Sequence, residues 1–433
     1  MRFKVLYLLF VSILISSSSF GQSPFVLNST LTEETTLVPH IEMSFEKGAS
    51  ITIEDIDSNR VAFESYNFEK VPVGSSTIWL RLQIQNKTAV QQSLTILTSR
   101  FDLLEFYFSN GKKVIGGNHY PNKGKEFIYR NNTYAPFVIE GNETIDCYIK
   151  AVFQDKADLH FEAIPQEFAI VNTADLVSEK ESRDLSLWIL CGAVAVMFCY
   201  NLLLFVLARD KGYMYYAFFT VVIFFFNLAF SGKFIEMMPS AELNELFQNY
   251  AGFLALSGMI LFYRKLFNLR ERFPLYDKIT KGLLVYYALC FPLVYFGFNS
   301  FVVSTGPLAW LSVYVISFII AIKLGRQGNL TAKYFMIGNG VYFLFAVVAM
   351  LQTIGQLPPT FLGIKPYTFT ISGSIVELIL FSLSLGAKMN EMQNNLLNKE
   401  IELRHEEEKR REKKRIGEQT KSASRRKGTR TYV

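Results

Sequence analysis

Six apolar stretches follow one another between residues 185 and 387, and they limit the folds open to this chain more than any other feature. A helix that crosses a bilayer needs about 20 predominantly apolar residues. The fourth stretch is about twice that length and is interrupted at Gly297–Ser300, so it predicts a hairpin of two helices. Residues 184–387 are therefore predicted to form seven membrane-spanning helices. The stretches are Leu185–Ala208, Gly212–Gly232, Leu246–Tyr263, Gly282–Ile322, Tyr334–Ile364 and Pro366–Ala387.

Positive charge is distributed unevenly over the loops between these stretches. The first, third and fifth loops carry eleven Lys and Arg residues, whereas the other three carry only Lys233 and Lys365. Because Lys and Arg accumulate in cytoplasmic loops, we expect the amino terminus outside and the carboxyl terminus in the cytoplasm. Residues 1–21 independently resemble an export signal, since Arg2 and Lys4 precede a short apolar stretch and then small residues. A first membrane anchor is the alternative.

Residues 22–183 have no long apolar stretch and instead show the period of β-strands. Ile78, Leu80, Leu82 and Ile84 alternate with polar or aromatic neighbours, and the alternation returns further along the chain. This pattern predicts half-buried strands separated by Gly and Asn turns. The expected fold class is therefore an all-β exported domain, an antiparallel sandwich or jelly roll, followed by an all-α seven-helix bundle.

The chain after the last apolar stretch is rich in charge. Apolar residues spaced by threes and fours predict a short helical, coiled-coil stalk over residues 388–412, through which two copies form a homodimer. Residues 413–433 are predicted to be a disordered basic tail. The whole net charge of +6 lies in the last 48 residues, which favours anionic membrane lipids over nucleic acid as a partner. The apolar positions are Leu385, Met389, Met392, Leu396 and Leu403, interrupted by Lys399.

An exported β domain, seven helices and a helical stalk together resemble a known family. The order is similar to that of the bacterial seven-transmembrane receptors with diverse intracellular signalling modules, of the kind that carries the second type of extracellular domain. Short stretches of sequence carry the resemblance as well. They are Ile51–Ile56, Trp79–Leu82 with Asn86, Tyr200–Leu204, Arg209–Lys211, Tyr213–Tyr216, and Gly373 and Glu377 with Leu383–Lys388.

The resemblance implies a receptor in the bacterial inner membrane. Its outer domain would bind a small extracellular ligand, with a carbohydrate as one candidate, and its helices would relay the signal to an output module such as a histidine kinase or nucleotide cyclase. The residues after the stalk are too few for such a module. The output is therefore expected either in a separate cytoplasmic signalling protein or in a domain lost by truncation or frameshift.

Motifs for catalysis or metal binding do not emerge from the sequence. No glycine-rich phosphate loop, nucleophile elbow or carboxylate pair is found, so we do not expect an enzyme. The histidines His40, His119, His160 and His405 have no ligand-like spacing, so neither a metal site nor a cofactor is predicted. A transporter or channel with an outer capture domain is the alternative from another functional class, and a membrane scaffold is a third.

Trp79 and Arg81 are the predicted ligand-binding residues of the outer domain. Both lie on the polar face of an otherwise apolar strand, and a Trp beside an Arg can stack on and hydrogen-bond a sugar or a carboxylate. The structural alternative is a Trp packed against the second sheet and an Arg that holds a neighbouring carboxylate.

Glu377 lies near the middle of the last apolar stretch. An ionisable side chain there costs about 2.5 to 3.5 kcal/mol on insertion scales, so it should face the interior of the bundle. One hypothesis is a proton or ion relay. The other is a structural or signalling hydrogen bond to Asn201, Asn227 or Asn339 on neighbouring helices.

Overall fold

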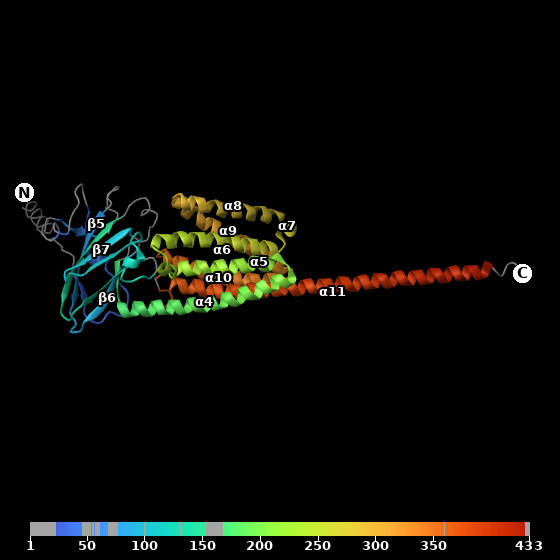
Figure 1. The fold of residues 1–433 in the computed structure, drawn as a ribbon, viewed down its shortest axis with the longest axis horizontal. Coiled ribbons are helices and arrows are strands. Elements are labelled where there is room, and N and C mark those ends of the chain that lie inside the picture. The colour runs from blue at the N-terminus through green and yellow to red at the C-terminus, as the bar shows by residue number, and fades with distance from the viewer. Residues whose placement is uncertain are drawn as a thin grey trace, which may run out of the picture.

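A computed structural model of the protein describes residues 23–45, 53, 56, 61–67, 77–98, 101–129, 132–152, 168–358 and 360–428. Figure 1 shows a β domain followed by a bundle of long helices, with the last helix leaving the bundle at the end opposite the β domain and extending alone. The predicted signal peptide, residues 1–21, lies outside the described residues.

The described residues of the β domain form two sheets. The first contains β1 (Phe25–Leu27), β3 (Ile41–Phe45), β4 (Glu64–Ser65), β5 (Thr77–Asn86), β7 (Leu103–Phe108), β8 (Lys113–Gly116) and β10 (Thr144–Val152). Its order is β4-β3-β5-β10-β7-β8, with β1 beside β5. The second contains β2 (Thr35–Thr36), β6 (Gln92–Thr98), β9 (Thr133–Ile139) and β11 (Phe168–Asn172) in the order β2-β11-β6-β9.

The alternation seen in the sequence of β5 places one side of that strand in the core. Ile78, Leu80, Leu82 and Ile84 are fully buried, and they share one hydrophobic core with residues of the second sheet such as Phe137. One pairing differs from the antiparallel prediction, because β1 runs parallel to β5. The two strands are distant in sequence, so no hairpin forces them to be antiparallel.

Over the residues that the structure describes, the helical part contains seven long helices and a single-turn helix. They are α4 (Thr173–Ala208), α5 (Lys211–Phe230), α6 (Ala241–Leu266), α7 (Leu269–Arg272), α8 (Pro274–Tyr295), α9 (Asn299–Arg326), α10 (Leu330–Thr353) and α11 (Pro366–Gly428). Short 3-10 turns lie at η1 (Val38–His40), η3 (Asn122–Gly124) and η4 (Phe234–Met237). Side-chain oxygens of Asn172, Asp210, Ser240 and Asn329 accept hydrogen bonds from the first turns of α4, α5, α6 and α10, which fixes where these helices begin.

Six of these helices are long and apolar enough to cross a membrane, counted over the residues that the structure describes. The predicted hairpin within 282–322 is confirmed as α8 and α9, which Gly297 separates with a positive φ of 84°. Helix α8 is outside the group of six. Asp277, Lys278 and Lys281 occupy its first turns, and these charges lower its mean hydropathy. A seventh crossing by α8 therefore stays a prediction.

Helix α11 continues through Gly428, past residue 413, where the sequence predicts a tail without structure. The part of α11 beyond the bundle is rich in good helix formers such as Glu, Lys, Arg and Leu, and pairs four residues apart support it. Arg404 contacts Glu400 at 2.7 Å and Arg410 contacts Glu406 at 4.0 Å. The apolar residues predicted to form the dimer contact of the stalk are exposed in this single chain. Leu396 and Leu403 are 67% and 62% exposed. The homodimer stays a prediction.

Candidate functional site

Trp79 and Arg81 lie on the outer face of the first sheet, because residues two apart on a strand share a face. Trp79 is nevertheless only 1% exposed. Its ring lies 5.9 Å from the ring of Tyr107, and the Lys150 ammonium lies 5.7 Å from its centroid. The Trp79 ring therefore packs against its own sheet rather than the second sheet, and it presents no open face to a ligand in this structure.

Arg81 holds a neighbouring carboxylate. Its Nε donates to Glu42 Oε2 at 2.8 Å, its Nη2 donates to the same oxygen, and its guanidinium lies 4.9 Å from the Phe63 ring centroid. The side chain is still 39% exposed. The structural alternative considered for Arg81 is therefore present, and part of the side chain remains exposed on the outer face of the sheet.

A hollow of about 320 Å³ lies beside Arg81 on the same outer face. Gln83 donates to Asp146 at 2.8 Å across two neighbouring strands within it. Donors and acceptors thus line the hollow together with the ring of Tyr148, a combination that suits a small polar molecule. The structure brings Arg81 to the hollow, whereas Trp79 is not part of its lining. The lining is Ser23, Pro24, His40, Glu42, Arg81, Gln83, Asp146 and Tyr148.

A buried asparagine joins the β domain to the helices. Asn122 in the η3 turn donates from Nδ2 to the carbonyl oxygens of Ile235 and Met238 at 2.8 and 2.9 Å, and its backbone N–H donates to the Pro239 oxygen at 2.9 Å. These three bonds hold the β domain on the loop between α5 and α6. Because each acceptor is a backbone atom, these bonds form only in one fixed arrangement of the β domain and the loop between α5 and α6.

Beside this contact lies a charged network around Arg183 of α4. The Arg183 side chain is fully buried, and its Nη2 donates to Asp184 Oδ1 at 2.7 Å and to Glu236 Oε1 at 2.6 Å. Lys233 donates to the second oxygen of each carboxylate at 2.7 and 2.8 Å. The Tyr129 ring of the β domain covers the guanidinium at 4.7 Å. The β domain therefore covers part of this junction network.

The electrostatics of the junction network follow from these contacts. Burial raises the pKa of Glu236, but hydrogen bonds from Lys233 and Arg183 outweigh it and hold that pKa below its usual value of 4.5. Burial lowers the pKa of Lys233, and its hydrogen bonds to the two carboxylates more than reverse this, so its pKa is raised above 10.5. Both groups are charged at neutral pH and hold each other in place.

Lys365 connects three parts of the molecule at the start of α11. Its Nζ lies 3.6 Å from Glu34 Oε2 in the β domain and 3.4 Å from Glu179 Oε2 on α4. Glu179 also accepts a hydrogen bond from Tyr129 at 2.7 Å. Lys365 immediately precedes Pro366, the first residue of α11. These ion pairs connect the start of α11 both to the β domain and to α4.

Glu377 of α11 is fully buried in the bundle, as the sequence predicts. Within the described part of the chain, neither of its carboxyl oxygens has a hydrogen-bond partner. The predicted partners bind elsewhere. Asn201 donates to the Met197 carbonyl oxygen of its own helix, and Asn339 donates to Ser317 Oγ at 2.8 Å.

Asn227 is the one predicted partner that reaches α11. Its Nδ2 donates to Ser374 Oγ at 2.9 Å, one turn before Glu377. One turn further along, the Tyr216 hydroxyl of α5 donates to the carbonyl oxygen of Leu378. Helix α5 therefore holds the part of α11 inside the bundle by two buried hydrogen bonds on either side of Glu377 rather than by a bond to that carboxyl group.

Comparison with known families agrees with this architecture. Residues 183–388 match the family model described as 7TM diverse intracellular signalling. Residues 38–163 match the model described as 7TMR-DISM extracellular 2. The chain belongs to the seven-transmembrane receptors with diverse intracellular signalling. No curated protein matches the chain. As a member of this receptor family, the protein has an extracellular domain and a membrane domain involved in signalling.

The contacts that join the two parts of this receptor were not predicted from its sequence. The sequence around Asn122 indicates only a turn, and Lys365 contributes only to the count of positive charges in the loops. Arg183 marks the end of the β domain in the sequence but gives no sign of two carboxylate partners. The available signal was a set of charges at the ends of neighbouring helices, because such charges often pair. They are Arg183 and Asp184 beside the first apolar stretch, and Lys233 and Glu236 in the second loop.

Proposed function

We propose that this receptor senses a small polar ligand outside the cytoplasm, with a carbohydrate as the leading class, and relays its presence along α11 to a cytoplasmic signalling protein such as a kinase or cyclase. The inner membrane is the proposed location, with the β domain outside, α8 as a seventh crossing and the stalk in the cytoplasm. The charge of the loops supports this orientation. The family's intracellular signalling role supports the cytoplasmic partner.

The observation that carries this proposal is a single helix, α11, that starts beside the β domain and leaves the bundle at the opposite end. Lys365 ties the outer end of α11 to Glu34 of the β domain, and the same helix continues without interruption to Gly428. A ligand in the hollow beside Arg81 would change how the β domain sits on the bundle. Because Lys365 follows that domain, α11 would shift or rotate against α5, and the stalks of two copies would change their contact.

The first test measures ligand binding by the full chain in detergent. Its melting temperature is followed against a panel of mono- and oligosaccharides and small organic acids. We expect a saturable rise for one class, lost in Gln83→Ala. Gln91→Ala is the matched control, since Gln91 also donates to a carboxylate, that of Glu140, but just outside strands β6 and β9 of the second sheet. No rise with any compound, or an equal rise in both variants, would reject the hollow as the ligand site.

The second test separates sensing from relay. Spin labels on the stalk report the distance between two copies with and without the ligand found in the first test. Lys365→Gln should keep the rise in melting temperature and lose the change in stalk distance. Lys123→Gln, which changes an exposed lysine of the β domain, should keep both. A Lys365→Gln protein whose stalks respond normally would contradict the relay through α11.

A transporter or channel is the competing function, and the observation in its favour is the buried Glu377, whose carboxyl oxygens have no hydrogen-bond partner among the described residues. It predicts substrate flux in proteoliposomes that is lost in Glu377→Gln. The receptor predicts no flux in either protein. Deletion of residues 388–433 should abolish downstream output in cells and leave membrane insertion intact, and normal output in that variant would exclude the relay.

A further inference from the structure

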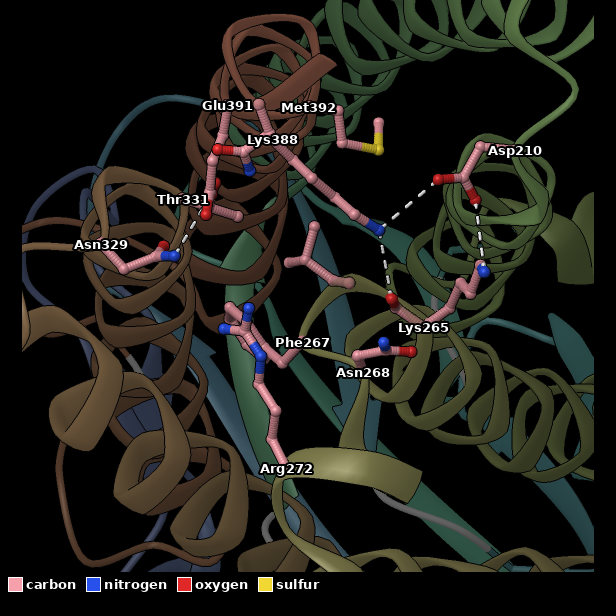
Figure 2. A pocket seen from close by; sticks show the side chains of 12 residues that line it. Asp210, Lys265, Phe267, Asn268, Arg272, Asn329, Thr331, Lys388, Glu391 and Met392 are labelled. Carbon is pink, nitrogen blue, oxygen red and sulfur yellow. Dashed lines mark hydrogen bonds and ion pairs between the residues drawn. The ribbon is translucent and has the colours of Figure 1, made fainter. Parts of the chain in front are cut away.

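A cavity of about 250 Å³ lies where α11 leaves the bundle, at the end farthest from the β domain. Five elements contribute to its walls: the turn after α4, the end of α6, the short helix α7, the start of α10, and α11 itself. Figure 2 shows these side chains converging on one space. The lining is Asp210, Lys265, Leu266, Phe267, Asn268, Arg272, Asn329, Thr331, Lys388, Glu391, Met392 and Asn395.

The charges around this cavity do not balance. Three cationic side chains face two carboxylates, so the lining carries a net positive charge. Lys388 Nζ lies 3.6 Å from Asp210 Oδ2, and Lys265 Nζ lies 3.9 Å from Asp210 Oδ1. Both distances exceed the 2.7–2.9 Å or so of a tight charged hydrogen bond. One carboxylate is thus shared loosely by two ammonium groups, and Lys388 also donates to the Lys265 carbonyl oxygen at 3.2 Å.

Arg272 supplies the third positive charge. It ends helix α7, and Figure 2 shows its guanidinium extending into the cavity from the side opposite Lys388. Across the described ranges of the chain, no ion pair is formed by Arg272. A guanidinium presents its donors as a planar fork that matches two oxygens of a phosphate group. A tetrahedral anion between Arg272 and Lys388 would therefore receive donors from both sides.

Thr331 gives an independent sign of a missing ligand. Its side chain lines the cavity, the residue is only 3% exposed, and its hydroxyl has no hydrogen-bond partner among the described residues. A buried hydroxyl without a partner costs free energy. Its carbonyl oxygen accepts from Ser384 of α11 at 2.8 Å, which fixes its position. Thr331 also lies in the first turn of the 24-residue helix α10, where the helix dipole favours an anion.

We propose that this cavity binds a phosphate group, held by Arg272, Lys388 and the Thr331 hydroxyl. The phosphate belongs either to the headgroup of an anionic phospholipid or to a small soluble phosphate ester. The lipid source is geometrically reasonable because the cavity lies at an end of the apolar helices, where headgroups are found. The binding site stands on the geometry alone.

Its consequence for signalling rests on the proposed function. A bound phosphate competes with Asp210 for the Lys388 ammonium. Asp210 caps the first turn of α5 through Gly212, so its bond to Lys388 ties α11 to the start of α5. Phosphate binding replaces that tie by a contact to α7 and α10. The bound and free forms therefore hold the exit of α11 against different helices.

The test uses the full chain and two sources of phosphate. In detergent, glycerol phosphate is titrated against sodium chloride of equal ionic strength. In nanodiscs, phosphatidylcholine is compared with mixtures of increasing phosphatidylglycerol content. The readout is the melting temperature from tryptophan fluorescence. We expect a saturable rise in at least one arm: a rise with glycerol phosphate alone assigns a soluble ligand, and a rise with phosphatidylglycerol alone assigns a lipid headgroup.

Variants decide whether the cavity is responsible. Arg272→Gln should need about tenfold more phosphate for the same rise, because it removes a charged hydrogen-bond donor. Thr331→Val, which keeps the side-chain shape, should weaken binding in the same direction. Arg270→Gln is the matched control, since Arg270 lies on the same short helix but outside the lining.

No rise in either arm would overturn the proposal, and so would equal binding by wild type, Arg272→Gln and Thr331→Val. The sugar-dependent rise described above uses the β domain and is measured separately, so failure of one site is distinguished from failure of the other.

Discussion

Replacing Arg183 by Met should cost about 3 kcal/mol of stability. The Arg183 guanidinium is fully buried and makes three hydrogen bonds to Asp184 and Glu236, at 2.9, 2.7 and 2.6 Å. Removing one partner of a buried ion pair typically costs about 3–5 kcal/mol, because the other charge is left buried. Here Lys233 stays bonded to both carboxylates, which places the expected cost at the lower end.

The assay is unfolding of the full chain in mixed micelles, followed by tryptophan fluorescence. A cost of about 3 kcal/mol lowers the ratio of folded to unfolded protein roughly a hundredfold. Arg183→Lys should recover part of the loss, since it keeps the charge but not the fork of donors. Arg410→Met, at an exposed pair on the stalk, is the control and should change stability by less than about 1 kcal/mol. An Arg183→Met protein as stable as wild type would refute the reasoning.

Four further outcomes are expected. The pKa of Glu236 is lowered in the folded protein, so the stabilisation by this carboxylate is present above the usual pKa of 4.5 and is lost as the pH falls below that value. Below pH 4.5 the melting temperature of wild type should therefore drop more steeply than that of Glu236→Gln. Parallel curves of melting temperature against pH would disprove this. Gly338→Ala should destabilise by about 1–3 kcal/mol, because its new Cβ would lie 2.9 Å from Leu380 Cβ; an unchanged melting temperature would show that α10 and α11 separate freely. Asn227→Leu should weaken the hold of α5 on α11 and raise the proteolysis rate of the bundle. Glu377→Gln should be at least as stable as wild type in the same melting assay, because neither carboxyl oxygen has a hydrogen-bond partner in the described chain; a large loss would reveal a contact that stabilises the carboxylate.

Periodicity and charge in the sequence predict the main elements of this receptor. Each apolar stretch contains helix, but the ends differ: α4 begins at Thr173, before the stretch Leu185–Ala208, whereas α10 ends at Thr353, before the end of the stretch Tyr334–Ile364. A hydropathy pattern indicates the apolar part of a helix and not a polar extension of the same helix. The alternation around Leu80 predicts a buried face of β5 because its period of two is a local property of the strand.

Long-range contacts were the part that the sequence did not reveal. Glu377 was placed correctly in the interior because burial follows from its neighbours in sequence. Its hydrogen bonding was not, because that depends on how helices are rotated against one another. The same holds for Asn122, whose acceptors lie more than 110 residues away. A single sequence gives the character of each residue, whereas its partner is decided by tertiary packing.

The length of α11 beyond Lys388 makes the stalk a lever. Forty residues separate Lys388 from Gly428 in one unbroken helix, which is about 60 Å of rod. With the fulcrum at Lys388, a tilt of about 5° would move the far tip by about 5 Å over that length. A change too small to repack the bundle would thus become a displacement comparable to one helical turn. The number of residues in the stalk also sets which side of the helix faces a partner, since each added residue turns the tip by about 100°.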